Sequence, residues 1–420
     1  MLVWIKVGLR NLVKNRRRSV ITLMAIAVGF AAVNLFAGFA EYMHDSNRLV
    51  TIYGSGQGHI MIFRKGFLEK GRLASSRYLL TAKEIKTIRG VCAKNPEVEL
   101  ATPQLNITGF LTNGKESTIF LARGIVPSAR HLFLERMRAL FLSKARTITA
   151  APEGRPLADD QEEGVAVSRG LAELLQLKLG DTAVAFSQTI DGEMNALNVQ
   201  VFQLFNVRSE LNDKFMIVPF SLARKLYDTK GADQVAVLLT RTERTRAVRR
   251  QLARALKAEG LDLDLKTWDE MSEWYRKIKG MFDTIFRFLF IIVFATVVMS
   301  VTNTMSMNVL ERTREIGTLR ALGLKRRGVL SLFTIESGLL GVLGSLAGMV
   351  LTIIGWWLVK TLQPTWVPPA VPRAVVIRID LVPEKMIWSF LFLVVLCLVA
   401  SLIPARRAAG LNVVEALGHV

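Results

Sequence analysis

Four long apolar runs divide the chain. They cover about residues 20–39, 285–309, 329–359 and 386–403. Each run approaches or exceeds the ~20 residues that a helix needs to cross a ~30 Å hydrocarbon core. The pattern therefore predicts four membrane-spanning helices. The first helix is expected to cover the span and the start of a stalk over 20–42. It is expected to continue beyond the membrane as far as Gly54.

The segment between the first two spans, residues 43–280, has the mixed pattern of an α+β domain. Near its start, about 54–103, two strand-like runs flank a helix that opens with the capping-box pair Thr81 and Glu84. Near its end, about 233–267, the order strand–helix–strand returns. If the two units pair, they form a ferredoxin-like sheet with helices on one face.

The middle of this domain, about 104–232, is predicted to be a β-rich insertion. Asn-Gly at 113–114 and Asp-Gly at 191–192 each lie between alternating apolar runs, which is a strong hairpin signal. One helix is expected near 168–177, and the polar stretch 151–164 is expected to be a loop.

The second span is predicted to extend beyond the membrane. Thr267 and Glu270 form another capping-box spacing, and only Gly280 interrupts the pattern that follows. A helix over 268–310 would be ~64 Å long at ~1.5 Å per residue, about twice what the bilayer core requires. Residues 268–284 are therefore expected to form a continuous stalk, which a proline at Tyr275 would break.

Charge fixes the expected orientation. The net charge is +20, and basic residues concentrate in 1–19, 310–328 and 404–420. With four spans these three segments share one side, so the positive-inside rule places both termini in the cytoplasm. Residues 43–280 and the short loop 360–385 then lie outside. The mixed apolar and basic N-terminus suits an amphipathic surface helix.

The first span could instead be a cleaved signal peptide, with "GFA" at 38–40 as the cleavage site. An apolar run of about 20 residues exceeds the ~7–15 of a signal h-region, so an anchor is preferred. Cys92 falls in the external domain and Cys397 in a span. We expect no disulfide and no metal site, and we expect Cys92 to react with an impermeant thiol reagent if the fold exposes it.

Catalytic patterns are missing from the sequence. Residues 109–116 match the phosphate-loop pattern G-x-x-x-x-G-K, but Glu116 replaces the Ser or Thr that would bind magnesium. The stretch also suits a hairpin turn. Basic clusters are not interleaved with base-stacking aromatics, which argues against nucleic-acid binding. We expect no enzyme activity and no cofactor bound by this chain.

Two features of the third span are candidates for function. Glu336 is ionisable within the membrane, which marks either a functional site or a polar contact with Asn303 or Asn308 of the second span. Small residues recur along the same helix and suit close packing, within the chain or at a dimer seam. They are Gly341, Gly344 and Gly348.

The stretch "ERTREIGTLRALG" at 311–323 separates the second and third spans. Its basic residues could serve only as topology anchors. The spacing also places Ile316, Leu319 and Leu322 on one helical face, with Arg314 elsewhere. It predicts a short amphipathic helix whose charged side docks on a cytoplasmic partner. The candidate residues are Glu311, Arg312, Arg314, Glu315, Ile316, Gly317, Leu319, Arg320, Ala321, Leu322 and Gly323.

These motifs resemble those of a known family. "ERTREIGTLRALGLKRRGVLSLFTIES", "IPARRAAGLNVVEAL" and "GHIMIFRKGF" are similar to segments of the FtsX-like permeases of ABC transporters, which include lipoprotein-releasing and macrolide-exporter types. The likeness covers nearly the whole chain, and it is greatest to the lipoprotein-releasing type. The fold class expected is an α-helical membrane protein with four transmembrane helices plus a large α+β extracytoplasmic domain.

The resemblance implies a mechanism and partners. Such permeases act as dimers, homo- or heterodimeric, in the bacterial inner membrane. Each docks through 311–323 on a separate cytoplasmic ATPase that holds ATP and Mg, and transmits motion to the external domain. The cargo expected is a lipoprotein or another hydrophobic molecule, handed to a periplasmic carrier or adaptor. Export of a peptide or drug, regulation of an external hydrolase, and ligand sensing by a receptor are the alternatives.

Overall fold

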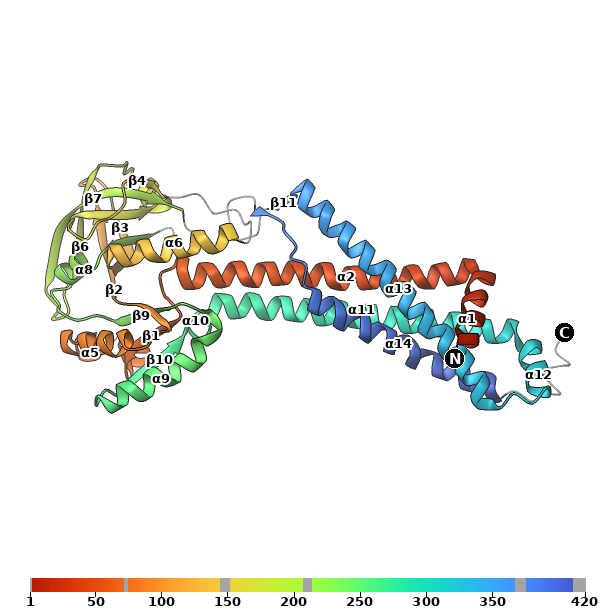
Figure 1. Cartoon of the computed structure of the whole chain (residues 1–420). Helices are drawn as coiled ribbons and strands as arrows, with labels where there is room; N and C mark the ends of the chain where they lie inside the picture. Colours follow the sequence, from red (N-terminus) through yellow and green to blue (C-terminus); the bar gives the residue numbers. More distant parts are fainter. Residues whose placement is uncertain (1, 72–74, 144–151, 207–213, 367–374, 411–420) are drawn as a thin grey trace. The chain divides into compact units, whose positions relative to one another are not determined.

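The computed structural model describes residues 2–71, 75–143, 152–206, 214–366 and 375–410 (Figure 1). The chain forms two compact units. The helical unit comprises Met1–His44, Ile278–Trp366 and Val376–Val420, and the sheet unit comprises Asp45–Lys277 and Val367–Val375.

Long helices make up the helical unit. They are α1 (Leu2–Lys14), α2 (Arg16–Leu49), α11 (Glu273–Glu311), α13 (Arg326–Leu362) and α14 (Pro383–Gly410), with the short α12 (Thr313–Ala321) between α11 and α13. Four helices are long and apolar enough to cross a membrane, and they contain the four predicted spans. A π-helical turn, Val50–Gly54, continues α2, so the predicted extension of the first helix to Gly54 is confirmed.

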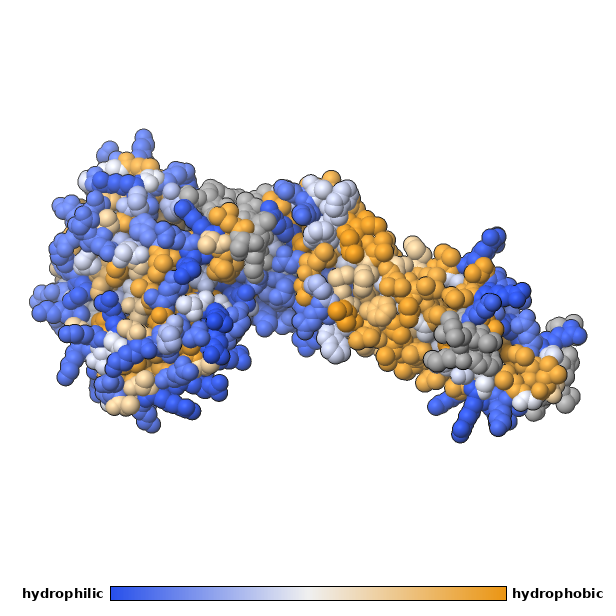
Figure 2. Space-filling model, viewed as in Figure 1, coloured by the Kyte–Doolittle hydropathy of each residue, from blue (hydrophilic) through white to orange (hydrophobic). Residues whose placement is uncertain are grey.

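The helical unit has its own apolar core. Phe30 of α2, Val301 of α11 and Phe333 of α13 are buried within it. Large apolar side chains such as Met299 and Trp388 also remain exposed on its outer surface, and Figure 2 shows apolar residues over much of the visible surface of these helices. An apolar exterior is unfavourable in water, whereas it suits helices surrounded by lipid.

A 10-stranded sheet forms the centre of the sheet unit, in the order β10-β1-β9-β2-β3-β8-β5-β7-β4, with β6 paired to β2 and β7. The strands are β1 (Ile60–Arg64), β2 (Val98–Thr112), β3 (Ser117–Ile125), β4 (Glu153–Gly154), β5 (Gly164–Ser168), β6 (Thr182–Gln188), β7 (Met194–Phe205), β8 (Phe215–Pro219), β9 (Gln234–Leu239) and β10 (Leu263–Thr267). Two more short strands are β11 (Thr365–Trp366) and β12 (Val375–Val376).

The helices of the sheet unit cover both faces of its first strands. They include α5 (Ala82–Ala93), α6 (Pro127–Ser143) and α9 (Thr245–Ala258), and the shorter helices are α3 (Phe67–Lys70), α4 (Ser75–Tyr78), α7 (Arg169–Leu174), α8 (Phe220–Leu226) and α10 (Trp268–Met271). Ile62 of β1 packs with α5 and α9, whereas its neighbour Phe63 packs with Phe133 of α6. The expectation of helices on one face was therefore wrong, because α6 covers the other.

The strand–helix–strand units β1–α5–β2 and β9–α9–β10 pair as β10-β1-β9-β2, with every neighbouring pair antiparallel. The boundary expected at 103/104 falls inside β2, which runs from Val98 to Thr112 and belongs to both parts of the sheet. The second part has its own core on β3, β5, β7 and β8.

Both predicted hairpins are present. β2 and β3 join at Asn113-Gly114, β6 and β7 join at Asp191-Gly192, and both glycines have positive φ. The apparent phosphate loop is therefore this first hairpin turn. The helix expected near 168–177 is α7. The sequence missed α6 and α8 because a β-rich insertion was expected there.

The predicted stalk is interrupted once. The Thr267–Glu270 capping box is present, but α10 ends after four residues, and Ser272 has an extended backbone with ψ of 91°. Helix α11 then begins at Glu273 and continues unbroken to Glu311. A continuous helix over 268–310 was therefore wrong at Ser272.

Candidate functional site

The stretch between the second and third spans folds as a separate helix. Arg312 leaves helical geometry, and its φ of −113° separates α11 from α12. Thr313 Oγ1 donates to the carbonyl oxygens of Val309 and Leu310, each at 3.0 Å, and so satisfies the last carbonyls of α11. Gly323, with φ of +97°, follows the end of α12, where a glycine is favoured. The helix predicted at 311–323 is thus shorter and begins at Thr313.

One side of α12 is anchored in the helical unit. Thr313, Ile316 and Gly317 are buried, and Ile316 belongs to the core of that unit. The predicted apolar face does not stay together: Leu319 is 39% exposed and Leu322 is 81% exposed. Ile316 therefore fixes the helix, while the two leucines remain available for another surface.

Glu336 of α13 is fully buried and contacts polar side chains of α11 and of Arg312, which lies between α11 and α12. Asn308 of α11 donates from Nδ2 to Glu336 Oε1 at 3.2 Å. Arg312 Nη1 lies 3.4 Å from Glu336 Oε2, and the Arg312 side chain is only 13% exposed. Of the two contacts expected for Glu336, the one with Asn308 is present, and no contact with Asn303 is found in the described residues.

The same cluster reaches the N-terminal segment. Asn15 Nδ2 donates to Asn308 Oδ1 at 3.2 Å. Arg312 Nε donates to Glu315 Oε2 at 2.9 Å, and Lys14 Nζ donates to Glu315 Oε1 at 3.3 Å. These hydrogen bonds, that from Arg312 first, lower the pKa of Glu315 below its ordinary value. We call Asn15, Asn308, Arg312, Glu315 and Glu336 the polar cluster.

The remaining predicted residues of this stretch divide into two groups. Glu311 forms an ion pair with Arg18 of α2 at 2.6 Å, so it too is engaged within the chain. Arg320 is half-buried and makes an interaction within the chain. The exposed residues form what we call the exposed tip: Arg314, Leu319, Ala321, Leu322 and Gly323.

The glycines of the third span pack inside the chain. A Cβ at Gly341 would lie 3.1 Å from Cys397 Cβ of α14, and one at Gly344 would lie 2.8 Å from Ile26 Cβ of α2. A Cβ at Gly348 would lie 2.6 Å from Phe30 Cβ. Of the two expectations, internal packing is therefore the one that the structure supports.

The sequence did not reveal the part that Lys14, Asn15 and Arg18 play at this site. Their segment was interpreted only as an amphipathic surface helix with topology charges. Asn15 carried a usable signal, since an amide close to the start of an apolar span needs a hydrogen-bonding partner. Its partner Asn308 stands 293 positions away in the sequence, and only the fold brings the two together.

The described part of the chain offers no candidate metal site. Within the ranges that the structure describes, no group of three or more His, Cys, Asp or Glu side chains could hold a metal ion. Cys92 and Cys397 are free and buried. Burial raises the pKa of the Cys92 thiol to about 12, so this thiol is unreactive at neutral pH.

Two family patterns match the sequence. Residues 19–255 match the MacB-like periplasmic core domain. Residues 287–413 match the FtsX-like permease C-terminal domain. The two matches together include α12 and most of each of the four apolar runs.

Three known proteins are similar to this chain in sequence. An ABC transporter permease of Methanocaldococcus jannaschii is 24% identical over 423 residues, covering 97% of this chain and 96% of that protein. The lipoprotein-releasing system transmembrane protein LolC of Xylella fastidiosa is 25% identical, covering 77% and 79%. The macrolide export ATP-binding/permease protein MacB 1 of Yersinia pestis is 28% identical over 48% of this chain, which spans 30% of that protein's length.

Proposed function

Because the chain belongs to the FtsX-like, MacB-type family of ABC transporter permeases, we propose that it docks a separate cytoplasmic ATPase through α12 and passes the motion of that ATPase to the sheet unit. The observation that carries this proposal is the combination of an anchored base and an exposed tip in one helix. Ile316 and Gly317 are buried, while Leu322 beside them is 81% exposed. ATP and Mg would bind the partner chain.

The tip has the composition of a docking surface. Burial of an exposed leucine contributes ~1.5–3 kcal/mol, so Leu319 and Leu322 together supply a substantial part of a binding energy. Arg314 adds a charge that an acidic groove would pair. The polar cluster holds the base of α12 against α11, α13 and the turn at Asn15, so a force on the tip moves these elements rather than bending a loop.

Helix α11 is suited to carry that motion. Its 39 residues, Glu273–Glu311, extend ~58 Å at ~1.5 Å per residue, well beyond a ~30 Å hydrocarbon core. The helix also includes residues of both compact units. A rigid helix between the ATPase-binding tip and the sheet unit supports mechanical transmission as the mode of action. The antiparallel order β10-β1-β9-β2 supports a ferredoxin-like interpretation of the part of the sheet that receives it.

The cargo we propose is a lipoprotein or another hydrophobic molecule, taken from the outer leaflet of a bacterial inner membrane and passed to a periplasmic carrier. The similarity to a lipoprotein-releasing protein over 77% of the chain favours this cargo. Similarity to macrolide export proteins, which reaches 98% of the chain, supports, as a second candidate, export of a peptide or drug with an adaptor. A second permease copy would complete the assembly, as a homo- or heterodimer.

The orientation we propose places α12 and both termini in the cytoplasm and the sheet unit outside. The basic segments 1–19 and 310–328 support it. Cys92, expected to report on topology, is buried and so cannot be labelled in the folded chain. Cysteines introduced at the exposed positions Lys115 and Lys325 replace it: an impermeant thiol reagent on spheroplasts should label the first and not the second.

Docking is tested by changing the tip without touching the base. Arg314→Glu with Leu322→Asp should weaken capture of the ATPase at least tenfold, since loss of a charge contact at an interface costs ~2–5 kcal/mol. Arg320, which the sequence proposed alongside Arg314, is left unchanged because it is engaged within the chain. Arg327→Glu is the matched control, an exposed basic residue at the start of α13 and outside the exposed tip.

Membrane insertion of each variant is checked separately by protease protection. If a correctly inserted tip variant binds the ATPase as strongly as the control does, docking through the exposed tip is refuted. The basic residues of this stretch would then serve only to fix the membrane topology.

A further inference from the structure

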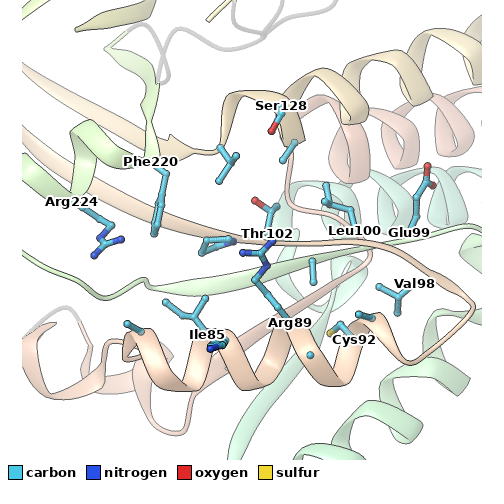
Figure 3. A pocket seen from close by; sticks show the side chains of 18 of the residues that line it. Ile85, Arg89, Cys92, Val98, Glu99, Leu100, Thr102, Ser128, Phe220 and Arg224 are labelled. Atoms are coloured by element: carbon cyan, nitrogen blue, oxygen red, sulfur yellow. The ribbon is translucent and has the colours of Figure 1, made fainter. Parts of the chain in front are cut away.

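A cleft of about 750 Å³ opens in the sheet unit. It is bounded by α5, the first half of β2, the residues after β3 and helix α8. Figure 3 shows Arg89 of α5 on one side of β2 and Ser128, at the start of α6, on the other. Neither the docking helix nor the polar cluster contributes to it.

The cleft follows a free edge of β2. Residues 98–104 of β2 pair with β9 on one side, while pairing with β3 on the other side begins only at Gln104. For 98–103, no strand among the described residues occupies that second side. All six of these residues line the cleft. Because successive side chains of a strand point to opposite faces, a cleft that touches six in a row runs along the strand edge.

A polar group without a partner also lies in this cleft. The Thr102 side chain is 3% exposed, and its Oγ1 has no hydrogen-bond partner among the described residues. An unsatisfied buried hydroxyl costs free energy that a ligand would recover by bonding to it. Together with the unpaired edge, the hydroxyl indicates a ligand that makes hydrogen bonds with the strand.

The charge of the cleft is strongly positive. Its basic side chains are Lys86, Arg89, Arg224 and Lys230. The one acid that lines it, Glu99, already accepts a hydrogen bond at 2.7 Å from Arg136 Nε. Lys86, Arg89 and Lys230 are exposed and form no ion pair with any described residue. Apolar groups such as Val126 and Phe220 complete the lining.

We infer that this cleft receives an extended acidic segment of a partner protein, which adds as a strand to the free edge of β2. An added strand uses the unpaired edge, carboxylates meet the basic rim, and alternate apolar side chains meet Val126 and Phe220. An anionic lipid headgroup would also meet the rim, but it has no backbone to pair with the strand. The inference does not depend on ATPase docking by α12, so the two can fail separately.

The test uses the full chain in phosphatidylcholine nanodiscs and a fluorescein-labelled peptide of alternating valine and glutamate, seven residues long. Fluorescence anisotropy should give micromolar binding. The same peptide with lysine for glutamate should bind at least tenfold more weakly. N-methylation of alternate peptide nitrogens, which keeps the charge and removes strand hydrogen bonds, should also weaken binding at least tenfold.

Variants locate the binding in the cleft. Lys86→Glu with Arg89→Glu should weaken binding at least tenfold, and Thr102→Val should weaken it severalfold. Arg250→Glu, an exposed basic residue of α9 outside the cleft, is the matched control and should leave binding unchanged. No binding of the acidic peptide by the wild-type chain, or equal binding by the double variant, overturns the inference.

One further outcome identifies a different ligand. If the N-methylated peptide binds as well as the parent, and soluble short-chain phosphatidylglycerol displaces both, the cleft is an anionic-lipid site and strand addition is refuted.

Discussion

The two compact units use buried polar side chains in different ways. In the sheet unit several of these side chains bond to the backbone of another segment. Gln104 Nε2 donates to the carbonyl oxygen of Gly56 at 2.6 Å, and the Asn106 backbone N–H donates to Asp233 Oδ2 at 2.6 Å. In the helical unit the hydrogen bonds between different segments join mostly one side chain to another. Thr22 Oγ1 lies 2.6 Å from Thr304 Oγ1, and the polar cluster joins four segments by side chains alone.

The difference follows from how each unit satisfies its backbone. A sheet has edges and irregular strand ends, where side chains complete the ladder. A long helix satisfies its interior backbone within itself, so hydrogen bonds between different helices of this unit run mostly from side chain to side chain. Polar side chains therefore hold strands in register in the sheet unit, whereas in the helical unit they hold helices to each other and to α12.

The largest effect is expected when the polar cluster loses one charge. Arg312→Leu leaves the buried Glu336 without the cation that pairs with it, and breaking a buried ion pair costs ~3–5 kcal/mol. The variant should unfold at lower temperature in detergent and should capture the ATPase poorly, although Arg312 is outside the exposed tip. Thermal unfolding and pull-down measure the two effects.

The double variant Arg312→Leu with Glu336→Leu is the control, because removing both charges avoids the uncompensated one. It should recover most of the stability. Asp233→Asn provides the contrast in the sheet unit: it keeps an oxygen to accept from Asn106 and should leave ATPase capture unchanged. If Arg312→Leu and Asp233→Asn behave alike, the proposed difference between the units is refuted.

A break in α11 is expected to separate the units functionally. Tyr275 is no longer a suitable position, because it lies in the first turn, where its N–H already bonds to Ser272 Oγ at 3.2 Å. Lys279 is exposed and lies in the interior of the helix. Lys279→Pro removes an interior hydrogen bond at a cost of ~3 kcal/mol.

Cargo release by the Lys279→Pro complex should fall, while basal ATPase activity and assembly persist. Lys279→Ala is the control and should retain release. Full cargo release by the proline variant would show that no rigid helix is needed between the units.

Periodicity and local chemistry predicted much of the fold. The four spans, the hairpins at Gly114 and Gly192, and the capping boxes at Thr81 and Thr267 depend on residues close in sequence, so short patterns reveal them. Helix α6 was missed because its apolar residues pack against the second face of β1, and the sequence expectation left that face open. The break at Ser272 depends on the backbone conformation of one residue.

The candidate site was predicted only in part. Its location between two spans and its end at Gly323 came from local patterns. The split between the buried Ile316 and the exposed Leu319 did not, because residues three apart share a helical face and only tertiary packing separates them. The bond from Asn15 to Asn308 joins segments far apart in the sequence, beyond the reach of any periodicity.

Replacing a helix glycine by alanine is expected to have a smaller effect on stability. The variant should be less stable where the glycine packs against another helix and more stable where the glycine faces open space. A Cβ at Gly348 would lie 2.8 Å from the Ala27 carbonyl oxygen, which cannot move without the backbone of α2. Gly348→Ala should therefore destabilise the helical unit by ~1–3 kcal/mol. Gly280 of α11 has no described atom within 4 Å of the added Cβ. Gly280→Ala should stabilise by up to ~1 kcal/mol through helix propensity.

Thermal unfolding of both variants in the same detergent provides the comparison. Equal shifts in the same direction would mean that α13 does not contact α2 as described.

The smallest net effect is the pH dependence of the sheet unit in the wild-type chain, where two buried groups act in opposite directions. Burial lowers the pKa of His59 to about 3 from its ordinary 6.5. As pH falls from 6.5 toward 3, the unfolded state binds a proton that the folded state refuses, so stability falls. Burial raises the pKa of Asp233 to about 6 from its ordinary 3.8. Between pH 6 and 3.8 the folded state binds the extra proton, so stability rises as pH falls.

Between pH 6 and 4 the contributions of His59 and Asp233 to stability should nearly cancel in the wild-type chain. A variant that lacks one of these two groups should show the pH dependence of the other. Asp233→Asn leaves His59 alone, so its stability should fall, relative to wild type, by up to ~1.4 kcal/mol per pH unit as pH falls. His59→Gln leaves Asp233 alone, so its stability should rise relative to wild type over the same range. Pulse proteolysis of the full chain in nanodiscs at pH 6, 5 and 4 measures both. Arg312→Leu, whose defect lies in the helical unit, should follow the wild-type pH profile of the sheet unit. If the two variants change in the same direction, buried charge in the sheet unit is not set by these two residues.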